Sequence, residues 1–320
     1  MYLSVVIPVY NEAESLPLLV PALSTALDPL GVTWEVILVD DGSTDGSATV
    51  LEELAAGTPD KVKVIVFRRN FGQTTAIAAG IDHAQGSVIA LLDADLQNDP
   101  ADIPAMLARL NEGYDLVSGW RVNRQDDFIT RTLPSQIANS LISWVTGVHL
   151  HDYGCTLKIY RREVLTGFHL YGEMHRFIPA YAGSVGAKIV EMPVHHHERK
   201  FGKAKYGLER TFKVMLDLIT VKFLISYTNK PIYLFGGLGI LQIVASIIVL
   251  AILIAMRFIT GVHLNRSPLL LLSAMLFIIG FQSIVLGLIA ELLVRTYHES
   301  QHKPTYTVRR MININSPHGT

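Results

Sequence analysis

The sequence of 320 residues has little of several features that define common protein classes. It has one cysteine, Cys155, which excludes an internal disulfide and a cysteine zinc cluster, and we expect this side chain to be buried. The formal net charge is −1, so no global field attracts nucleic acid. There is no Gly-x-Gly-x-x-Gly after the first predicted strand and no Walker lysine loop, which disfavours dinucleotide and P-loop binding. The first residues lack the basic and apolar regions of a signal peptide.

Apolar residues are abundant instead, and they concentrate towards the C-terminus. The mean hydropathy of +0.33 is high for a wholly soluble protein. Segments 232–256 and 268–290 contain no charged residue, and each exceeds the roughly 20 residues that cross a bilayer. We therefore predict two transmembrane helices joined by a short loop. Gln282 is the clear polar residue in the second span, and we expect it to hydrogen-bond across the helices.

The N-terminal part alternates short apolar runs with longer segments of helical composition. The predicted strands cover 3–10, 34–39, 62–67, 88–92 and 115–118, and the predicted helices cover 13–27, 48–56, 74–84 and 103–110. This alternation predicts an α/β fold with a mostly parallel, Rossmann-like sheet. In such sheets the ligand lies beyond the carboxyl ends of the strands.

Polar clusters follow the predicted strands at that edge. They are residues 10–12, 40–41, 68–70, 93–97 and 119–121. In an extended chain Asp93 and Asp95 point to the same side, and such a pair suits a hard divalent cation that completes its shell with waters and phosphate. The alternative is a pair of ordinary turn residues at a strand exit.

The motifs Val-x-Pro-x-Tyr-Asn-Glu at 6–12, Val-Asp-Asp-Gly-Ser-x-Asp at 39–45 and Asp-Ala-Asp-Leu-Gln at 93–97 resemble glycosyltransferase family 2, which has the GT-A fold. With the two spans, the chain is similar to the polyisoprenyl-phosphate glycosyltransferases of that family, such as dolichol-phosphate mannose synthase and bacterial bactoprenol glucosyltransferases. The resemblance implies a metal-dependent, inverting transfer of a hexose, with glucose from UDP-glucose favoured, to a membrane polyprenyl phosphate.

The resemblance also implies roles for individual residues. The residues expected to line the nucleoside pocket are Pro8, Tyr10, Glu12, Val39 and Asp41. Asp93, Asp95 and Gln97 would hold Mg²⁺ or Mn²⁺ and, with Ala94, the donor diphosphate. Arg121 matches a donor-site arginine of the family.

A basic segment at 197–206 resembles the family motif Arg-x-x-Gly-x-Ser-Lys, with Ala204 where the serine often stands. Arg199 and Lys205 would bind the donor phosphates, with Arg199 taking part in catalysis. The alternative is a solvated basic loop attracted to an anionic membrane. The adjacent residues 195–197 are three histidines, which cannot all face one ion, so we expect no zinc site.

Asp152 is, by resemblance, a candidate catalytic base. The second pKa of a phosphomonoester is about 6, so the acceptor oxygen is mostly ionised at neutral pH without a base. The alternatives are that Asp152 orients the acceptor or the sugar, or that it caps a turn. Segments 132–148 and 207–227 have apolar helical faces; the second is predicted to lie in the headgroup plane, and the first fits that plane or the core.

These features predict a cytoplasmic GT-A domain over 1–206, an interfacial helix over 207–230, two spans within 231–294 and a cytoplasmic tail over 295–320. The tail either adds an edge strand near 306–315 to a sheet of its own or of a neighbouring subunit, which would favour a homo-oligomer, or is disordered. Both termini are expected on the cytoplasmic side of a bacterial inner membrane. A processive polysaccharide synthase and a non-catalytic nucleotide-sugar-binding scaffold are the alternatives, and neither nucleic acid nor another cofactor is expected.

Overall fold

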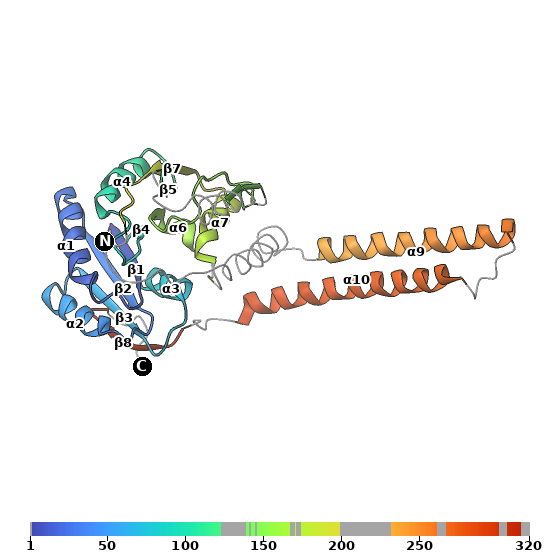
Figure 1. Ribbon diagram of the computed structural model, residues 1–320, viewed down its shortest axis with the longest axis horizontal. Helices are drawn as coiled ribbons and strands as arrows, with labels where there is room; N and C mark the ends of the chain where they lie inside the picture. The colour runs from blue at the N-terminus through green and yellow to red at the C-terminus, as the bar shows by residue number, and fades with distance from the viewer. Residues whose placement is uncertain are drawn as a thin grey trace. The chain divides into compact units, whose positions relative to one another are not determined.

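Figure 1 shows the computed structural model of the chain, which contains two compact units. The first comprises residues 1–221 and 304–320, and the second comprises residues 222–303. The structure describes residues 2–122, 139–140, 142–144, 146–166, 170, 174–198, 232–260, 267–300 and 306–314. The predictions for Arg199, Lys205 and the interfacial helix at 207–230 lie outside these residues, as does most of the segment 132–148.

The first unit has a sheet with helices on both faces. Its strands are β1 (Leu3–Val9), β2 (Trp34–Asp40), β3 (Val62–Phe67), β4 (Val88–Leu91), β5 (Leu116–Trp120), β6 (Lys158–Arg161), β7 (Ile189–Pro193) and β8 (Val308–Ile312). Its helices are α1 (Leu16–Leu27), α2 (Ser47–Gly57), α3 (Gln73–His83), α4 (Ile103–Asn111), α6 (Arg162–Leu165) and α7 (Ile178–Ser184), with 3-10 turns η1 (Asp28–Leu30), η2 (Pro100–Asp102) and η4 (Met174–Phe177).

The described strands form one sheet in the order β7-β5-β6-β4-β1-β2-β3-β8. Strands β4, β1, β2 and β3 are mutually parallel, and β1 lies between β2 and β4. Strand β6 runs antiparallel to both β4 and β5, whereas β7 pairs with β5 in parallel. The chain continues from β1 to β2 on one side and returns to β4 on the other side of β1. This change of direction opens a crevice at the carboxyl ends of β1 and β4.

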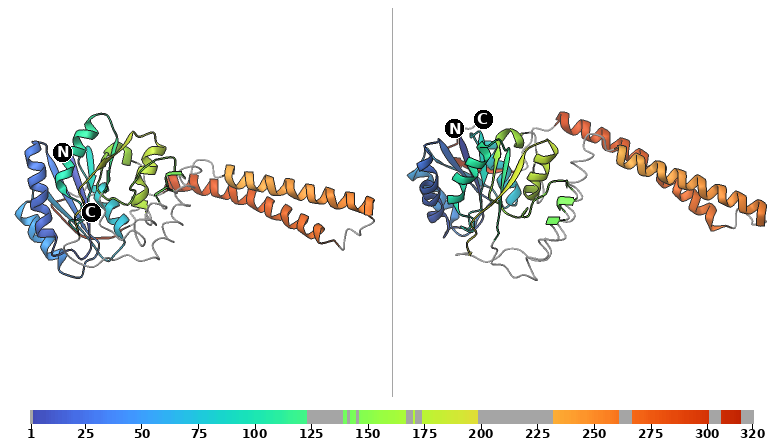
Figure 2. Two further views of the ribbon diagram at one scale, coloured as in Figure 1. Left: turned by 45° about the horizontal axis from the view of Figure 1, so that its top comes forward. Right: turned by 90° about the horizontal axis from the view of Figure 1, so that it is seen from above.

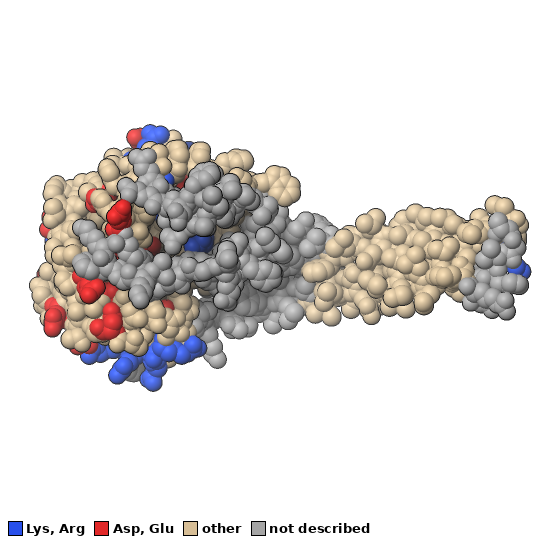
Figure 3. All heavy atoms as spheres, in the orientation of Figure 1, with Lys and Arg blue, Asp and Glu red and all other residues tan. Residues whose placement is uncertain are grey.

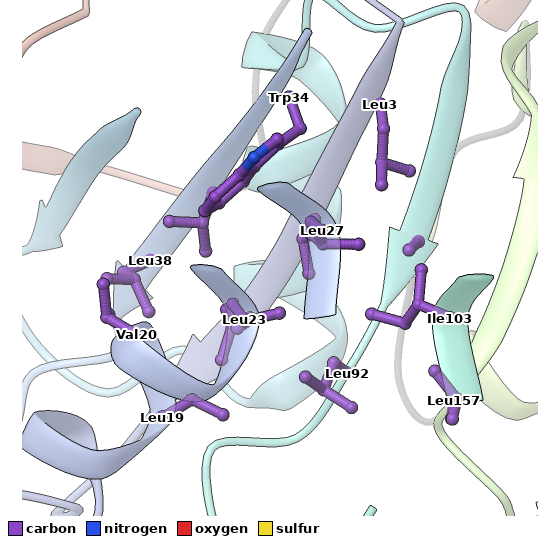
Figure 4. Packing of buried hydrophobic residues seen from close by; sticks show 14 of the residues in the cluster. Leu3, Leu19, Val20, Leu23, Leu27, Trp34, Leu38, Leu92, Ile103 and Leu157 are labelled. Atoms are coloured by element: carbon purple, nitrogen blue, oxygen red, sulfur yellow. The ribbon is translucent and has the colours of Figure 1, made fainter. Parts of the chain in front are cut away.

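Helix α1 packs its apolar side on the sheet because leucines recur with helical spacing. Leu19, Leu23 and Leu27 are fully buried in one cluster with Leu38 and Trp34 (Figure 4). Burying each leucine side chain contributes roughly 1.5–3 kcal/mol. Helices α2 and α4 bury residues in the same cluster, so the carboxyl ends of β1 and β4 rest on a continuous core.

Helix α3 covers the other face and approaches β1 unusually closely. A Cβ added at Gly80 would lie 2.2 Å from Cγ1 of Val6, so this position admits no larger side chain without movement. The close contact holds the N-terminal end of α3, at Gln73, near the carboxyl end of β4, where Gln73 bonds to Asp93.

The predicted α/β fold with a mostly parallel sheet is confirmed, with local differences. Helix α1 begins at Leu16 rather than residue 13, because the chain first makes a turn in which Ser15 donates its amide to the Glu12 carbonyl. Strand β6, which follows Asp152 in the chain, starts at Lys158 and runs antiparallel to β4. Strand β7 was not predicted, and its residues are mostly half-buried, so its apolar pattern is weak. Cys155 is fully buried, as expected.

The C-terminal tail contains β8, which pairs antiparallel with β3 of the same chain (Figure 1). The Tyr306 ring stacks on Phe67 at a centroid distance of 5.3 Å, and its hydroxyl donates to Asp82 Oδ2 over 3.0 Å. Asn313 Nδ2 donates to the carbonyls of Ala55 and Val62, each at 2.9 Å. The tail therefore covers the β3 edge of the sheet with β8 and contacts α3 and α2 through Tyr306 and Asn313.

The second unit is a hairpin of two long helices, α9 (Ile232–Thr260) and α10 (Pro268–Ser300), which lie side by side in both views of Figure 2. Their apolar stretches cover Phe235–Ile259 and Pro268–Ile289, with mean hydropathies of 2.8 and 2.5. Only 17% and 11% of the most apolar windows are buried, unlike the core helix of a soluble protein. Most of the described hairpin surface carries no charge (Figure 3).

Small residues set the contact between α9 and α10. A Cβ at Gly239 would lie 2.5 Å from the Gly280 carbonyl oxygen, and one at Gly280 would lie 2.7 Å from that of Gly239. Farther along, Ser246 Oγ donates to the Ser273 carbonyl over 2.8 Å. The expectation for Gln282 is wrong: this side chain is exposed, and the glutamine that bonds across the helices is Gln242, which accepts from Ser283.

Candidate active site

The loops after β1 and β2 are joined by hydrogen bonds that fix the rim of the crevice. Asn11 has a φ of 54°, in the left-handed region that Asn tolerates better than most residues, and its Oδ1 accepts the Thr44 amide over 2.8 Å. In return, the Asn11 amide donates to Ser43 Oγ and the Glu12 amide donates to Ser47 Oγ, each over 2.9 Å. The two motifs recognised in the sequence therefore form one connected structure.

Asp41 ties this structure to the loop after β3. It is 3% exposed and accepts the amides of Phe71 and Gly72 over 2.6 and 2.9 Å. Burial raises the pKa of Asp41 to about 6, against the lowering effect of the two amide bonds. Gly42 has a φ of +71°, and a Cβ there would lie 2.6 Å from the Arg69 carbonyl carbon, so glycine is required where the loops meet.

Asp93 and Asp95 follow β4 in this crevice. Gln73 Nε2 donates to Asp93 Oδ1 over 2.8 Å, and the Gln97 amide donates to Asp95 Oδ1 over 3.2 Å. Burial first, and then the charge of Asp95, raise the pKa of Asp93 to about 6. A cation between the two carboxylates would relieve this repulsion.

The two acids fit a metal that keeps part of its shell for solvent or phosphate. Across the part of the chain that is described, no group of three or more His, Cys, Asp and Glu residues could hold an ion. Two carboxylates and a neighbouring amide oxygen are the hard ligands that Mg²⁺ or Mn²⁺ accept, and Mg²⁺ usually retains several waters. The residues present therefore suit a cation that arrives with a diphosphate.

Arg121 and Asp152 form a buried, two-pronged ion pair next to this site. Arg121 Nε donates to Asp152 Oδ2 over 2.7 Å, and Nη2 donates to Oδ1 over 2.9 Å. Asp152 is 2% exposed and also accepts the Gly154 amide over 3.1 Å. Burial alone would lower the pKa of Arg121, but the bond to Asp152 and its charge raise it above its usual value. Both carboxylate oxygens of Asp152 are thus engaged.

The histidines at 195–197 hold their segment against the loop after β4. His195 Nδ1 lies 2.7 Å from Asp102 Oδ1, and His197 Nε2 lies 3.1 Å from Asp99 Oδ2. The His197 amide donates to the Gln97 carbonyl over 2.8 Å. These contacts place the start of the basic segment beside the Asp93–Gln97 loop, although Arg199 and Lys205 themselves are outside the described residues.

The structure brings most of the predicted site residues to one edge of the sheet. Pro8 of β1 pairs with Val39 of β2, and Tyr10 is exposed at the end of β1. Val39 is fully buried and Ala94 nearly so, so these two support the rim from inside. Trp120 stacks on the His151 ring at 4.4 Å beyond β5.

Sequence reasoning missed Gln73, Thr156 and Lys158. Gln73 is the first residue of α3, Thr156 bonds to Asp93, and Lys158 is a buried cation on β6. Lys158 carries the one signal that could have been used, since a lysine within an apolar strand is unusual.

Comparisons with known proteins agree with this geometry. Residues 4–168 match the family described as Glycosyl transferase family 2. The chain is 43% identical over 317 residues to dodecaprenyl-phosphate galacturonate synthase of Rhizobium johnstonii, covering 98% of this chain and 94% of the relative.

Solved structures share the fold at low identity. The S. aureus protein TarS, solved with UDP-GlcNAc, has a TM-score of 0.50 at 21% identity, with 70% of this chain and 67% of that chain covered. Glucosyl-3-phosphoglycerate synthase of Mycobacterium tuberculosis, solved with Mn²⁺, UDP and phosphoglyceric acid, has a TM-score of 0.51 at 17% identity, with coverages of 70% and 78%. The motifs, the sheet and the family match establish that this chain is a member of glycosyltransferase family 2.

Proposed function

We propose that the protein transfers a sugar from a nucleotide donor to a polyprenyl phosphate at the membrane surface. The observation that carries this proposal is the Asp93–Asp95 pair in a crevice of a family 2 domain whose chain continues into an apolar hairpin. A polyprenyl tail stays in the bilayer, so an enzyme that uses it must itself reach the membrane. The 43% identical relative, a dodecaprenyl-phosphate galacturonate synthase, supports the same acceptor.

In this proposal the donor lies along the edge formed by β1, β2 and β4. Tyr10, Glu12 and Asp41 line the side for the nucleoside, and Asp93, Asp95 and Gln97 hold Mg²⁺ or Mn²⁺. When bound, the cation neutralises charge on the departing nucleoside diphosphate. Mycobacterial glucosyl-3-phosphoglycerate synthase, which shares the fold, was solved with Mn²⁺ and UDP, which supports the choice of a divalent ion. Arg199 and Lys205 would add positive charge from the basic segment.

Asp152 acts as a positioning residue rather than a base in this proposal. Its two oxygens bind Arg121 at 2.7 and 2.9 Å, and an acceptor phosphate needs no base at neutral pH because its second pKa is about 6. Asp152 therefore fixes the guanidinium, whose remaining N–H groups donate to a phosphate oxygen in this proposal. Arg121 would then hold either the donor diphosphate or the acceptor phosphate close to the anomeric carbon.

The similarity to the 43% identical relative changes which sugar we propose is transferred. The resemblance of the motifs favoured glucose, whereas the relative across 98% of this chain is a galacturonate synthase. We therefore place a hexuronate ahead of glucose as the transferred sugar. The two sugars differ by a carboxylate, so the enzyme needs a cationic contact to distinguish them.

The test is a screen of radiolabelled nucleotide-sugars with undecaprenyl phosphate and the purified full-length protein in detergent, with Mg²⁺ or Mn²⁺. One labelled glycolipid with a single sugar is expected, and excess chelator should stop its formation. Products that grow by repeated addition would instead indicate a polysaccharide synthase. Donor binding without any product across the screen would indicate a non-catalytic scaffold.

A further inference from the structure

The turn at 151–155, which carries Asp152, is held by charged side chains from two strands of the sheet. Glu191 on β7 binds its amides, and Lys158 on β6 binds its carbonyls. Both strands are neighbours of β5, and Arg121 directly follows the end of β5. The turn is therefore fixed to the part of the sheet from which Arg121 extends.

Glu191 contacts two consecutive residues of the turn. Its Oε1 accepts the His151 amide over 2.8 Å and the Asp152 amide over 3.2 Å, and its Oε2 accepts the His151 amide over 2.9 Å. Oε2 also lies 2.8 Å from Nδ1 of the His151 ring. The Glu191 side chain is 11% exposed. Hydrogen bonds to a carboxylate are stronger than those between neutral groups, so this one side chain fixes the backbone that enters Asp152.

Lys158 holds the other end of the same turn. Its ammonium donates to the carbonyl of Tyr153, over 3.2 Å, and to that of Cys155. Lys158 is 3% exposed and lies in the field of the Asp152 carboxylate. A buried charge that lost its hydrogen bonds would be strongly destabilising, so this end of the turn is also held in place, and Glu191 holds the end that precedes Asp152.

The turn in its held position sets the geometry of Arg121. Asp152 accepts Nε and Nη2 of Arg121 over 2.7 and 2.9 Å. The His151 ring stacks on Trp120, the residue before Arg121, at a centroid distance of 4.4 Å. The charge of Arg121 in turn favours ionisation of Asp93. Contacts thus run from β7 through the turn to the guanidinium beside the proposed metal ligands.

We propose that Glu191 is a positioning residue for the transfer: it holds the amides of His151 and Asp152, so that Asp152 orients the Arg121 guanidinium towards a phosphate. This inference rests on the proposed transfer to a polyprenyl phosphate. A side chain on a strand holds its partner more precisely than one on a loop. Precision matters here because a displacement of about 1 Å at a reacting group can lower the rate about 100-fold.

The first test is a double-mutant cycle in the full-length enzyme. The kcat is measured with undecaprenyl phosphate and UDP-galacturonic acid or UDP-glucose, whichever the wild type transfers, for wild type, Glu191→Gln, Arg121→Lys and the double variant. Folded protein is quantified by size-exclusion chromatography in detergent. Glutamine keeps the shape of glutamate but places an NH2 group where an oxygen accepted an amide, and lysine cannot bind Asp152 through two parallel bonds. Asp115→Asn is the matched control, because Asp115 accepts the Lys188 amide over 2.8 Å at the opposite end of the β5–β7 pair.

Glu191→Gln should lower kcat at least about 10-fold when Arg121 is present. It should lower kcat less than about 2-fold in Arg121→Lys, because two residues that act through one contact are not additive. Asp115→Asn should leave kcat unchanged. An equal loss in both backgrounds would overturn the inference in favour of a general structural role. Glu191→Asp, which keeps the charge but is shorter, serves in the same cycle if Glu191→Gln does not fold.

The second test needs no transfer, because Trp120 reports the position of the His151 ring stacked on it. Its fluorescence is isolated in a full-length chain in which the other two tryptophans are replaced, by Trp34→Phe and Trp144→Phe. Glu191→Gln should release the ring and change the emission intensity, whereas the control should not. A wild type that transfers neither sugar would refute the proposed function. Unchanged Trp120 emission in Glu191→Gln, with a wild type that does transfer, would refute only this inference.

Discussion

The charge of Asp95 disfavours ionisation of Asp93, and a bound cation would offset that repulsion. Replacing Asp95 by Ala should lower turnover at least about 100-fold by removing one metal ligand. The melting temperature should stay the same or rise, because a repulsive charge is lost. Turnover and thermal unfolding of purified protein in detergent measure the two effects.

Asp60→Asn is the control for that change, because Asp60 is an exposed acid away from the crevice. It should leave both quantities unchanged. Full activity of Asp95→Ala, or of wild type in excess chelator, would contradict a metal at this pair.

The raised pKa of Asp41 predicts how the stability of the folded protein changes with pH. Its pKa is raised from 3.8 to about 6 in the folded state, so the folded protein binds more protons than the unfolded chain between these values. The contribution of Asp41 to the free energy of unfolding is therefore largest below pH 4, and it falls by about 3 kcal/mol as the pH rises through 6. Asp41→Asn cannot titrate, so the difference in melting temperature between wild type and variant should change between pH 4.5 and 6.5. Parallel curves for the two proteins would argue against a raised pKa.

At the level of single residues, the sequence predicted which side chains have chemistry suited to a site, but it did not predict which side chains contact one another. The spacing of Asp93 and Asp95 identified the pair, because alternation along a strand is local. The Arg121–Asp152 pair joins residues 31 positions apart, and Lys158 becomes a buried cation only when β6 is inserted between β4 and β5. Such contacts depend on strand order, which local patterns do not encode.

Strand β8 comes from the far end of the chain and pairs with the β3 edge of the sheet, next to the proposed donor site. The Arg68 amide donates to the Thr307 carbonyl over 3.2 Å, just before the loop that Asp41 holds. Ending the chain after Lys303 removes this bond, the Tyr306–Phe67 stacking and the pairing with β3. We expect a lower melting temperature and donor binding weakened several-fold, measured by titration of the nucleotide-sugar.

Tyr306→Phe is the milder companion to that truncation, because it keeps the stacked ring and loses only the hydroxyl bond to Asp82. It should cost about 1 kcal/mol of stability and leave donor affinity unchanged. Unaltered melting of the truncated chain would show that β8 does not support the sheet.

The hairpin depends on the glycine contact between α9 and α10. Gly280→Val would place a Cβ 2.7 Å from the Gly239 carbonyl oxygen and force the helices apart, whereas Gly237→Val meets nothing within 4 Å. Cysteines at Ser246 and Ser273, whose hydroxyl oxygens lie 3.2 Å apart, report the separation by disulfide formation. Gly280→Val should reduce cross-linking, and Gly237→Val should not; equal yields would refute the contact.

Elements with strong periodicity were predictable, since the parallel strands β1 to β4 and both apolar helices follow from local composition. Strand β7 was missed because its residues are half-buried and it lies at a sheet edge. The start of α1 was misplaced because hydrogen bonding of the Glu12–Ser15 turn, rather than propensity, decides where the helix begins.

For the whole molecule, we propose that the apolar helices span the membrane with the family 2 domain on the cytoplasmic side. A reporter fused after Thr320 should then be cytoplasmic, and one inserted in the loop 261–266 should be on the opposite side. Phosphatase and fluorescent-protein fusions distinguish the two sides. Detection of both reporters on one side would refute two complete crossings.

The pairing of β8 with β3 also limits how many times the chain between these strands can cross a membrane. Both strands belong to one sheet, yet the segment that separates them in the chain contains the whole hairpin. If α9 and α10 cross the membrane as proposed, this pairing requires an even number of crossings, and a chain whose second helix failed to insert would leave its tail on the other side of the bilayer from β3. Under the proposed topology, the sheet is therefore completed only in molecules in which both helices cross the membrane.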